Sequence, residues 1–368
     1  MKTKAAVLWG INQKWEIEEI DLDPPKEDEV LVKMTASGLC HSDYHLVTGD
    51  LPAPLPLIGG HEGAGVVVEV GPGVKEVAEG DHVVMSFLPA CGRCKPCARG
   101  MSNLCDLGAY LLTGAQLDGT FRFHARGRDV GQFLLLGTFS EYAVVPTASV
   151  IKLDDGAPLD KAALLGCGVT TGYGSAVRTG DVQPGDTVVV MGIGGVGVNA
   201  IQGARIAGAR NIVAIDPVDY KLKRSRDFGA THVAASVDDA IPMVKDLTWG
   251  EMANVCILTT DVAEGPYVAQ ALGLVGKRGR AVITAIGRAT DTTVNMSLFE
   301  LTMWEKQVRG GLFGSSNPRS DIFELLSLYE SGQLKLDELV TCEYTLDDVN
   351  QGYDDMLSGQ NLRGLIRY

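Results

Sequence analysis

The chain has 368 residues, a formal net charge of −14, 45% hydrophobic residues and 45 glycines. This acidic balance argues against nucleic acid and against anionic membrane surfaces as partners. The length exceeds that of one ordinary core, so we expect two domains. Because no apolar run reaches the length of a transmembrane helix and the N-terminal apolar stretch is short for a signal peptide, we predict a cytoplasmic protein without a membrane partner.

The N-terminal part of the chain alternates short β-branched runs with turns. Such runs occupy Val30–Met34, Gly65–Val70 and Asp81–Met85. β-branched residues favour strands, and the Gly71-Pro72-Gly73 segment is a turn signal that ends the second run. We therefore predict antiparallel β structure with long loops over the first part of the chain.

Four cysteines follow the third of these runs in one short loop: Cys91, Cys94, Cys97 and Cys105. Four thiolates this close in sequence can complete a tetrahedral shell around Zn2+. A ferredoxin-type iron–sulfur cluster is an alternative, but there the fourth cysteine usually follows much sooner and precedes a proline, whereas Asp106 follows Cys105. A disulfide pair is a further alternative, which a reducing cytoplasm disfavours. The spacing favours structural zinc.

Beyond residue 170, apolar runs of strand length alternate with helical stretches. This alternation is typical of a parallel, doubly wound sheet. The expected strands are Thr187–Met191, Asn211–Ile215, Val255–Leu258 and Arg280–Ile283, with a helix to about Ala207 after the first. The last part returns to mixed structure, with a helix at Asp321–Tyr329 and a strand at Leu365–Tyr368.

The segment Gly192-Ile193-Gly194-Gly195-Val196-Gly197 matches the dinucleotide-binding pattern G-x-G-x-x-G. It follows an apolar strand and opens a helix, which is the context that this short pattern needs. Gly194 would let a pyrophosphate approach the backbone, and Gly197 would let the helix pack on the sheet. Asp216 ends the next strand, where its carboxylate would bond ribose hydroxyls and repel a 2′-phosphate, which favours NAD over NADP. Lys221 lies close enough in sequence to bond the same ribose.

Three dispersed residues, Cys40, His61 and Cys167, are of metal-binding types. Each alone is more often an ordinary core or polar residue. Together they offer two sulfur ligands and one nitrogen ligand, which would leave a fourth position of a zinc ion open.

The order of these motifs over essentially the whole chain resembles that of the zinc-dependent medium-chain alcohol dehydrogenases. Two cysteines and one histidine are the zinc ligands already known from alcohol dehydrogenase, so the match of Cys40, His61 and Cys167 to this set is part of the resemblance. The region from Leu107 to Gly137 resembles the longer-loop members, and the chain is most similar to the NDMA-dependent alcohol dehydrogenases of actinobacteria. Those nicotinoproteins retain NAD(H) and pass electrons to an external acceptor, a dye in the assay or mycofactocin in the cell.

This resemblance implies an α/β fold, with a GroES-like antiparallel β catalytic domain and a doubly wound parallel Rossmann domain for NAD. The implied limits are residues 1–168 and 312–368 for the catalytic domain and 169–311 for the cofactor domain. It also implies two zinc ions per chain, one catalytic and one structural, and a small alcohol or aldehyde as substrate. Family members are oligomers that commonly pair the edges of their cofactor-domain sheets, and Thr302–Phe313 lies near that edge.

The resemblance further assigns site residues. The catalytic zinc would be held by Cys40, His61 and Cys167, with Glu62 beside it. Ser42 and His45 match the proton relay of the family, and Asp43 matches the carboxylate that orients His61. The cofactor contacts implied outside the glycine-rich loop are His41, which replaces an arginine of many members, Thr171 and Arg363. The implied walls of the substrate pocket are Leu51, Phe87 and Phe139.

Two other functions compete with this interpretation. A thiol-dependent formaldehyde dehydrogenase of the same fold would need basic residues for the carboxylates of glutathione or mycothiol, and the loop offers Arg122, Arg126 and Arg128. A conventional alcohol dehydrogenase would exchange its NAD freely. A binding protein that has lost its chemistry is disfavoured, because the full set of expected ligands and relay residues is present.

Overall fold

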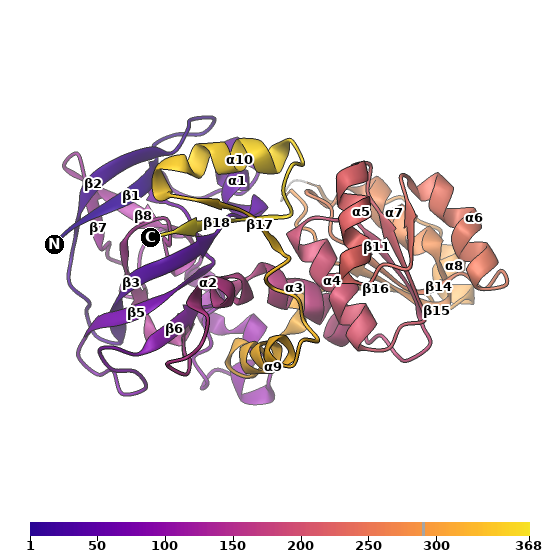
Figure 1. The fold of residues 1–368 in the computed structure, drawn as a ribbon, viewed down its shortest axis with the longest axis horizontal. Helices are drawn as coiled ribbons and strands as arrows, with labels where there is room; N and C mark the ends of the chain where they lie inside the picture. The colour runs from indigo at the N-terminus through magenta and orange to yellow at the C-terminus, as the bar shows by residue number, and fades with distance from the viewer. Residues whose placement is uncertain (289–290) are drawn as a thin grey trace. The chain divides into compact units, whose positions relative to one another are not determined.

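The computed structural model describes residues 1–288 and 291–368 (Figure 1). The described chain forms two compact units. The first contains Met1–Cys167, Asn317–Ser327 and Leu336–Tyr368, and the second contains Gly168–Ser316 and Leu328–Lys335. The domain limits inferred from the resemblance stay a prediction. None of the helices in the described ranges combines the length and the apolar composition needed to cross a bilayer.

The first unit is built from a small closed barrel and a larger sheet. Most neighbouring strands are antiparallel, as expected, but β4 pairs with β8 and β17 with β18 in parallel. The barrel contains β1 (Lys2–Leu8), β2 (Glu16–Leu22), β7 (Phe123–Ala125), β8 (Arg128–Gln132) and β4 (Leu57–Ile58). The sheet contains β10 (Val150–Lys152), β6 (His82–Met85), β5 (Gly63–Val70), β3 (Glu29–Gly38), β18 (Arg363–Arg367) and β17 (Val340–Tyr344), with β9 (Tyr142–Pro146) on β3.

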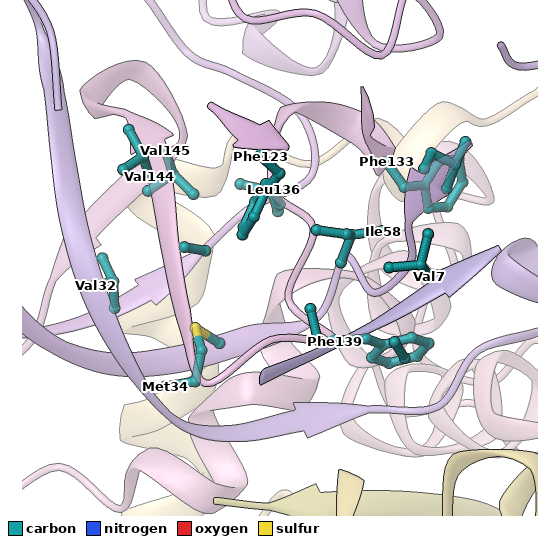
Figure 2. Close-up of a cluster of buried hydrophobic side chains, with 14 of the residues drawn as sticks. Val7, Val32, Met34, Ile58, Phe123, Phe133, Leu136, Phe139, Val144 and Val145 are labelled. Carbon is teal, nitrogen blue, oxygen red and sulfur yellow. The ribbon is translucent and has the colours of Figure 1, made fainter. Parts of the chain in front are cut away.

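The core of the first unit is a cluster of apolar side chains that the barrel and the sheet share. Figure 2 shows part of it, including Val7 and Ile58 from barrel strands and Phe139 from the loop before β9. The helices of this unit are α1 (His41–Thr48), α2 (Leu159–Ala162), α9 (Pro318–Glu330) and α10 (Val349–Leu357). The N-terminal strands β1 and β2, the barrel closure and helix α10 are absent from the sequence-based expectation, whereas the helix expected at Asp321–Tyr329 is confirmed as part of α9.

The second unit is a six-stranded parallel sheet in the order β13-β12-β11-β14-β15-β16. All five residues of β11 are buried, because helices cover both faces of such a sheet. The strands are β11 (Thr187–Met191), β12 (Asn211–Ile215), β13 (His232–Ala234), β14 (Ala253–Leu258), β15 (Val275–Ile283) and β16 (Gln307–Gly310). The helices are α3 (Gly168–Gly174), α4 (Gly195–Ile206), α5 (Asp219–Phe228), α6 (Val237–Leu247), α7 (Gly265–Leu274) and α8 (Leu298–Met303).

Strand β11 lies between β12 and β14, so the direction of chain progression reverses at this point of the sheet. Ligands of doubly wound sheets bind at such a reversal, beyond the carboxyl ends of the strands. The loop after β11 and the residue after β12 therefore occupy the position where a nucleotide would be held. The predicted parallel, doubly wound sheet is confirmed.

Candidate active site and metal centres

A buried cluster in the first unit contains Cys40, His61, Glu62 and Cys167. One ligand atom from each residue lies within 4.8 Å of the others, and all four residues are buried. Cys40 stands directly before α1, His61 and Glu62 lie between β4 and β5, and Cys167 follows a short 3-10 turn at Ala163–Gly166. Three distant segments thus meet at one point, as the dispersed motifs predicted.

The imidazole of His61 is held from several sides. Its Nδ1 lies 3.1 Å from Oδ2 of Asp43, and Oδ1 of Asp43 accepts a hydrogen bond of 2.7 Å from the backbone N–H of Gly60. The rings of Phe87 and Phe133 stand edge-on to the imidazole, with centroids 5.9 and 5.4 Å away. A histidine fixed in this way through one nitrogen is the usual arrangement of a metal ligand.

The second ring nitrogen of His61, Nε2, is buried and has no hydrogen-bond partner within the described residues. A buried polar atom without a partner is costly and asks for an explanation. The adjacent sulfur atoms of Cys40 and Cys167 supply one, since two sulfurs and one imidazole nitrogen are the donor set that suits zinc with an open position. The cluster therefore fits a catalytic zinc ion.

Interactions within the cluster favour the thiolate of Cys40 but not that of Cys167. A hydrogen bond from the Cys167 thiol, reinforced by His61 and Arg363, holds the pKa of Cys40 well below its usual range despite burial. The same hydrogen bond and burial raise the pKa of Cys167. Burial opposes the protonation of His61, but the negative charges of Asp43 and Cys40 outweigh it and raise its pKa.

Glu62 is fully buried, and its carboxylate forms an ion pair with the guanidinium of Arg363 from β18. This pair compensates a charge that burial alone would make very costly. Gly38 provides the space, because a Cβ atom there would overlap the Glu62 carboxylate. The Nε of Arg363 has no hydrogen-bond partner in the described part of the chain. Its contact with a cofactor pyrophosphate stays a prediction.

The proposed relay residues lie on α1. The Oγ of Ser42 is 3.7 Å from Sγ of Cys40, and Nδ1 of His45 is 3.7 Å from Oδ2 of Asp50. Positions three residues apart share a helix face, so Ser42 and His45 line the same side of α1. His41, which replaces an arginine of many relatives, packs its ring near His45 with centroids 6.2 Å apart.

The four cysteines of the loop after β6 form a second cluster, with their sulfur atoms within 4.8 Å of one another. All eight cysteines of the chain carry free thiols. Backbone N–H groups of Cys91 and Cys94 donate to the sulfurs of Cys105 and Cys91 at 3.5 and 3.4 Å. Against the effect of burial, backbone N–H donors lower the pKa of Cys91 to about 6, while burial raises that of Cys105 to about 12. Four thiols with no place for a substrate fit a closed, structural zinc site.

Helix α9 secures this loop from the far end of the sequence. Arg319 donates from Nε to the carbonyl of Ala90, the residue before Cys91, at 2.9 Å. Its Nη1 lies 2.8 Å from a carboxylate oxygen of Glu76. The cysteine loop is therefore tied to the rest of the first unit through its backbone as well as through its thiols.

In the second unit, the glycine-rich loop connects β11 to α4. Gly192 has φ +92°, and a Cβ atom there would lie 2.7 Å from the carbonyl oxygen of Thr259. A Cβ at Gly197 would overlap the carbonyl of Gly192, so both positions require glycine. A Cβ at Gly194 would meet no atom of the described residues within 4 Å, which leaves this side of the loop open to a ligand such as a pyrophosphate.

Asp216 stands at the end of β12 and is only 5% exposed. Its Oδ2 accepts a hydrogen bond of 2.7 Å from the N–H of Ile193 within the glycine-rich loop, and its Oδ1 accepts one of 2.9 Å from Val218. Each carboxylate oxygen retains a lone pair for a ribose hydroxyl. Lys221 is half-buried on α5, and Thr171 lies on α3 with a buried hydroxyl that has no hydrogen-bond partner among the residues described. These features fit NAD.

Comparison with known proteins agrees with these sites. The family model for the alcohol dehydrogenase GroES-like domain matches residues 26–155, and that for zinc-binding dehydrogenases matches residues 195–331. The chain is 52% identical to an NDMA-dependent alcohol dehydrogenase of Amycolatopsis methanolica over 100% of its own length and 99% of the relative's. The chain belongs to the zinc-binding alcohol dehydrogenase family. The resemblance inferred from the motifs, including that to the NDMA-dependent members, is confirmed.

Further relatives in this alcohol dehydrogenase family support the same assignment. Alcohol dehydrogenase B of Mycobacterium tuberculosis is 52% identical over 100% of this chain and 99% of its own. Among solved structures, a benzyl alcohol dehydrogenase from Acinetobacter calcoaceticus superposes with a TM-score of 0.92 at 30% identity, covering 100% of this chain and 99% of that one. The fold predicted from the sequence is thereby confirmed.

Within residues 1–288 and 291–368, the three predicted pocket residues of this alcohol dehydrogenase have different surroundings, and their role as pocket walls stays a prediction. Phe87 faces His61, whereas Phe139 is fully buried in the core and packs edge-on to Trp15 with centroids 5.7 Å apart. Leu51 lines a different feature, an apolar cavity of about 360 Å3 formed by Ile11, Leu46, Gly49, Leu51, Pro52, Ala53, Pro54 and Leu55. Sequence reasoning did not identify Phe133, which contacts His61 more closely than Phe87 does; no local motif marks it.

The arginines that could have served a thiol cofactor are engaged elsewhere. Arg122 is fully buried, and its Nε and Nη2 donate to the two oxygens of Glu29 at 2.7 and 2.5 Å. Arg126 is ion-paired with Glu16 and Glu18 and stacks over the ring of Trp9. Two of the three basic residues are thus part of the fold of this alcohol dehydrogenase, which weakens the formaldehyde dehydrogenase alternative.

Proposed function

We propose that this protein oxidises small alcohols to aldehydes, and catalyses the reverse reaction, by hydride transfer to an NAD that remains bound and is recycled by an external acceptor. The observation that carries the proposal is the buried Cys40–His61–Cys167 cluster, with an unsatisfied His61 Nε2, in a chain 52% identical to an NDMA-dependent relative. The glycine-rich loop with Asp216 supports NAD as the acceptor of hydride.

A zinc ion at this cluster supplies Lewis-acid chemistry that favours loss of the alcohol proton, and NAD supplies the acceptor for the hydride. The protein's own residues orient the metal ligands and remove the alcohol proton. Asp43 orients His61, while Arg363 balances the charge of Glu62. The Oγ of Ser42 can take the alcohol proton, and His45, one turn further along α1, can carry it away. The oxidised substrate thus loses one hydride and one proton.

Retention of the nicotinamide cofactor is tested with the purified full-length protein, without added NAD. After gel filtration, we expect a reduced-nicotinamide absorbance to co-elute with the chain and to disappear when the dye NDMA is added. With ethanol or benzyl alcohol as probes, turnover should require NDMA and be independent of added free NAD. Catalytic turnover of free NAD would show instead a conventional alcohol dehydrogenase, and activity that appears only with added thiol would indicate the formaldehyde dehydrogenase.

We also propose that the protein is a homo-oligomer assembled through the β16 edge of the second unit. Strand β16 pairs only with β15 in the described sheet, so its other edge is unpaired. Helix α8 and strand β16 also expose large apolar side chains. Leu298, Phe299 and Met303 are 69%, 70% and 63% exposed, and Val308 lies on the strand itself.

Light scattering tests this assembly. The native protein should have a mass that is a multiple of 39.1 kDa, and Val308→Asp should lower it. Phe323→Asp is the matched control, because Phe323 is also an exposed apolar residue but lies on α9 of the first unit. A native mass of one chain, or equal effects of the two substitutions, would contradict the proposal.

A further inference from the structure

We propose that Tyr353 is a positioning residue for the catalytic metal centre, acting from the C-terminal helix α10 on Cys40. The inference rests on the proposed function, but its test does not depend on turnover alone. Tyr353 is 4% exposed, and its hydroxyl donates to the carbonyl oxygen of Cys40 at 3.4 Å.

This contact lies at the start of α1, on the backbone of a sulfur ligand. The carbonyl of Cys40 also receives the backbone N–H of Asp43 at 3.2 Å, which closes the first turn of α1. The carboxylate of Asp43 is shared between Gly60 and His61. The hydroxyl of Tyr353 therefore bonds the same carbonyl as the backbone N–H of Asp43, the residue that orients the imidazole ligand.

The ring of Tyr353 is fixed by its neighbours. It stacks with Trp15 and with Tyr44, whose ring centroids lie 6.4 and 6.0 Å away and whose planes are inclined by 26° and 27°. Phe139 closes a further side at 6.3 Å. A ring held on several sides directs its hydroxyl to one place, so the hydrogen bond to Cys40 costs little conformational entropy.

Helix α10 itself is seated on the metal-bearing segment. The side chain of Asn350 forms two hydrogen bonds with the backbone of Trp15, at 3.0 Å to its N–H and 2.9 Å to its carbonyl. At Gly352, directly before Tyr353, a Cβ would overlap the side chain of Leu39, the residue before Cys40. These contacts fix the position of α10, and therefore that of Tyr353, relative to Cys40.

Tyr353→Phe separates this role from simple packing, because it keeps the ring and removes only the hydroxyl. Residues that support metal ligands in this way typically change metal affinity or activity about 10–100-fold when they are replaced. We expect chelator competition to show a loss of zinc affinity in that range at one of two sites. The four-cysteine site, which Tyr353 does not touch, serves as an internal reference within the same molecule.

Tyr344→Phe is the matched control. The hydroxyl of Tyr344 likewise donates one hydrogen bond, to the carboxylate of Asp355 at 2.7 Å, but it lies outside the metal cluster. In the cobalt-substituted proteins, Tyr353→Phe should shift the visible d–d bands, and Tyr344→Phe should leave them unchanged. Equal zinc affinity and unchanged bands in Tyr353→Phe would overturn the inference. If the native protein lacks alcohol turnover but the affinity and bands respond as expected, the proposed function fails and this inference stands.

Discussion

Cys167→Ser should lower alcohol turnover by at least about a thousandfold while the chain stays folded and holds one zinc ion where the native protein holds two. The sulfur of Cys167 is one of three donors in the buried cluster, and a neutral serine hydroxyl is a poor substitute for a thiolate. A catalytic metal contributes several kcal/mol to transition-state stabilisation, and each 1.4 kcal/mol or so corresponds to tenfold in rate. Elemental analysis, circular dichroism and the NDMA-coupled assay measure the three quantities.

Cys97→Ser is the informative counterpart. Cys97 belongs to the closed four-cysteine cluster, so Cys97→Ser should also remove one zinc ion. Its main effects should be lower thermal stability and weaker oligomer assembly. The two substitutions thus remove the same kind of atom from two sites with different consequences. A native zinc content near one per chain would eliminate one site, and native turnover by Cys167→Ser would exclude the cluster as the catalytic centre.

Arg122→Met should destabilise the first unit by about 3–5 kcal/mol, because it leaves the buried carboxylate of Glu29 without its partner. The guanidinium binds both oxygens of Glu29, at 2.7 and 2.5 Å, and also reaches Asp118 at 2.9 Å. For domains of this size, each kcal/mol lowers Tm by roughly 2–4 °C. Differential scanning calorimetry should therefore record a fall of about 6 °C or more.

The double variant Arg122→Met with Glu29→Gln is the control for this ion pair. It removes the uncompensated charge, so it should recover part of the stability that Arg122→Met loses. Zinc content should be native in both proteins, since neither residue belongs to a metal cluster. A single variant with native Tm, or a double variant less stable than the single, would show that burial of the carboxylate is not the dominant cost.

The features that the sequence predicted well are those encoded over short stretches. The cysteine loop, the glycine-rich loop and the strands of the parallel sheet each occupy a few consecutive residues with a distinctive spacing, and strand β11 has the predicted limits. The assignment of Cys40, His61 and Cys167 as zinc ligands depended on resemblance to a family, because the three residues lie far apart in the sequence and share no local motif.

What the sequence did not reveal depends on contacts between distant residues. Tyr353 meets Cys40 across 313 positions, and Arg122 meets Glu29 across 93. The sequence offered Arg122 as a basic residue for a ligand, since residue type carries no information on burial, whereas the structure encloses it completely. Phe139, which the resemblance places in the pocket wall, lies in the core beside Trp15, a contact that its local sequence does not indicate either.

The two backbone hydrogen bonds of Asp216 complicate any attempt to redesign the coenzyme preference of this enzyme. Removing its carboxylate to admit a 2′-phosphate would also deprive the N–H groups of Ile193 and Val218 of their acceptor and loosen the glycine-rich turn. Loss of NAD affinity in such a variant would then combine a missing ribose contact with a disordered turn. A switch toward NADP would need a neutral acceptor at this position, as Asn provides, before any cationic residue is introduced nearby.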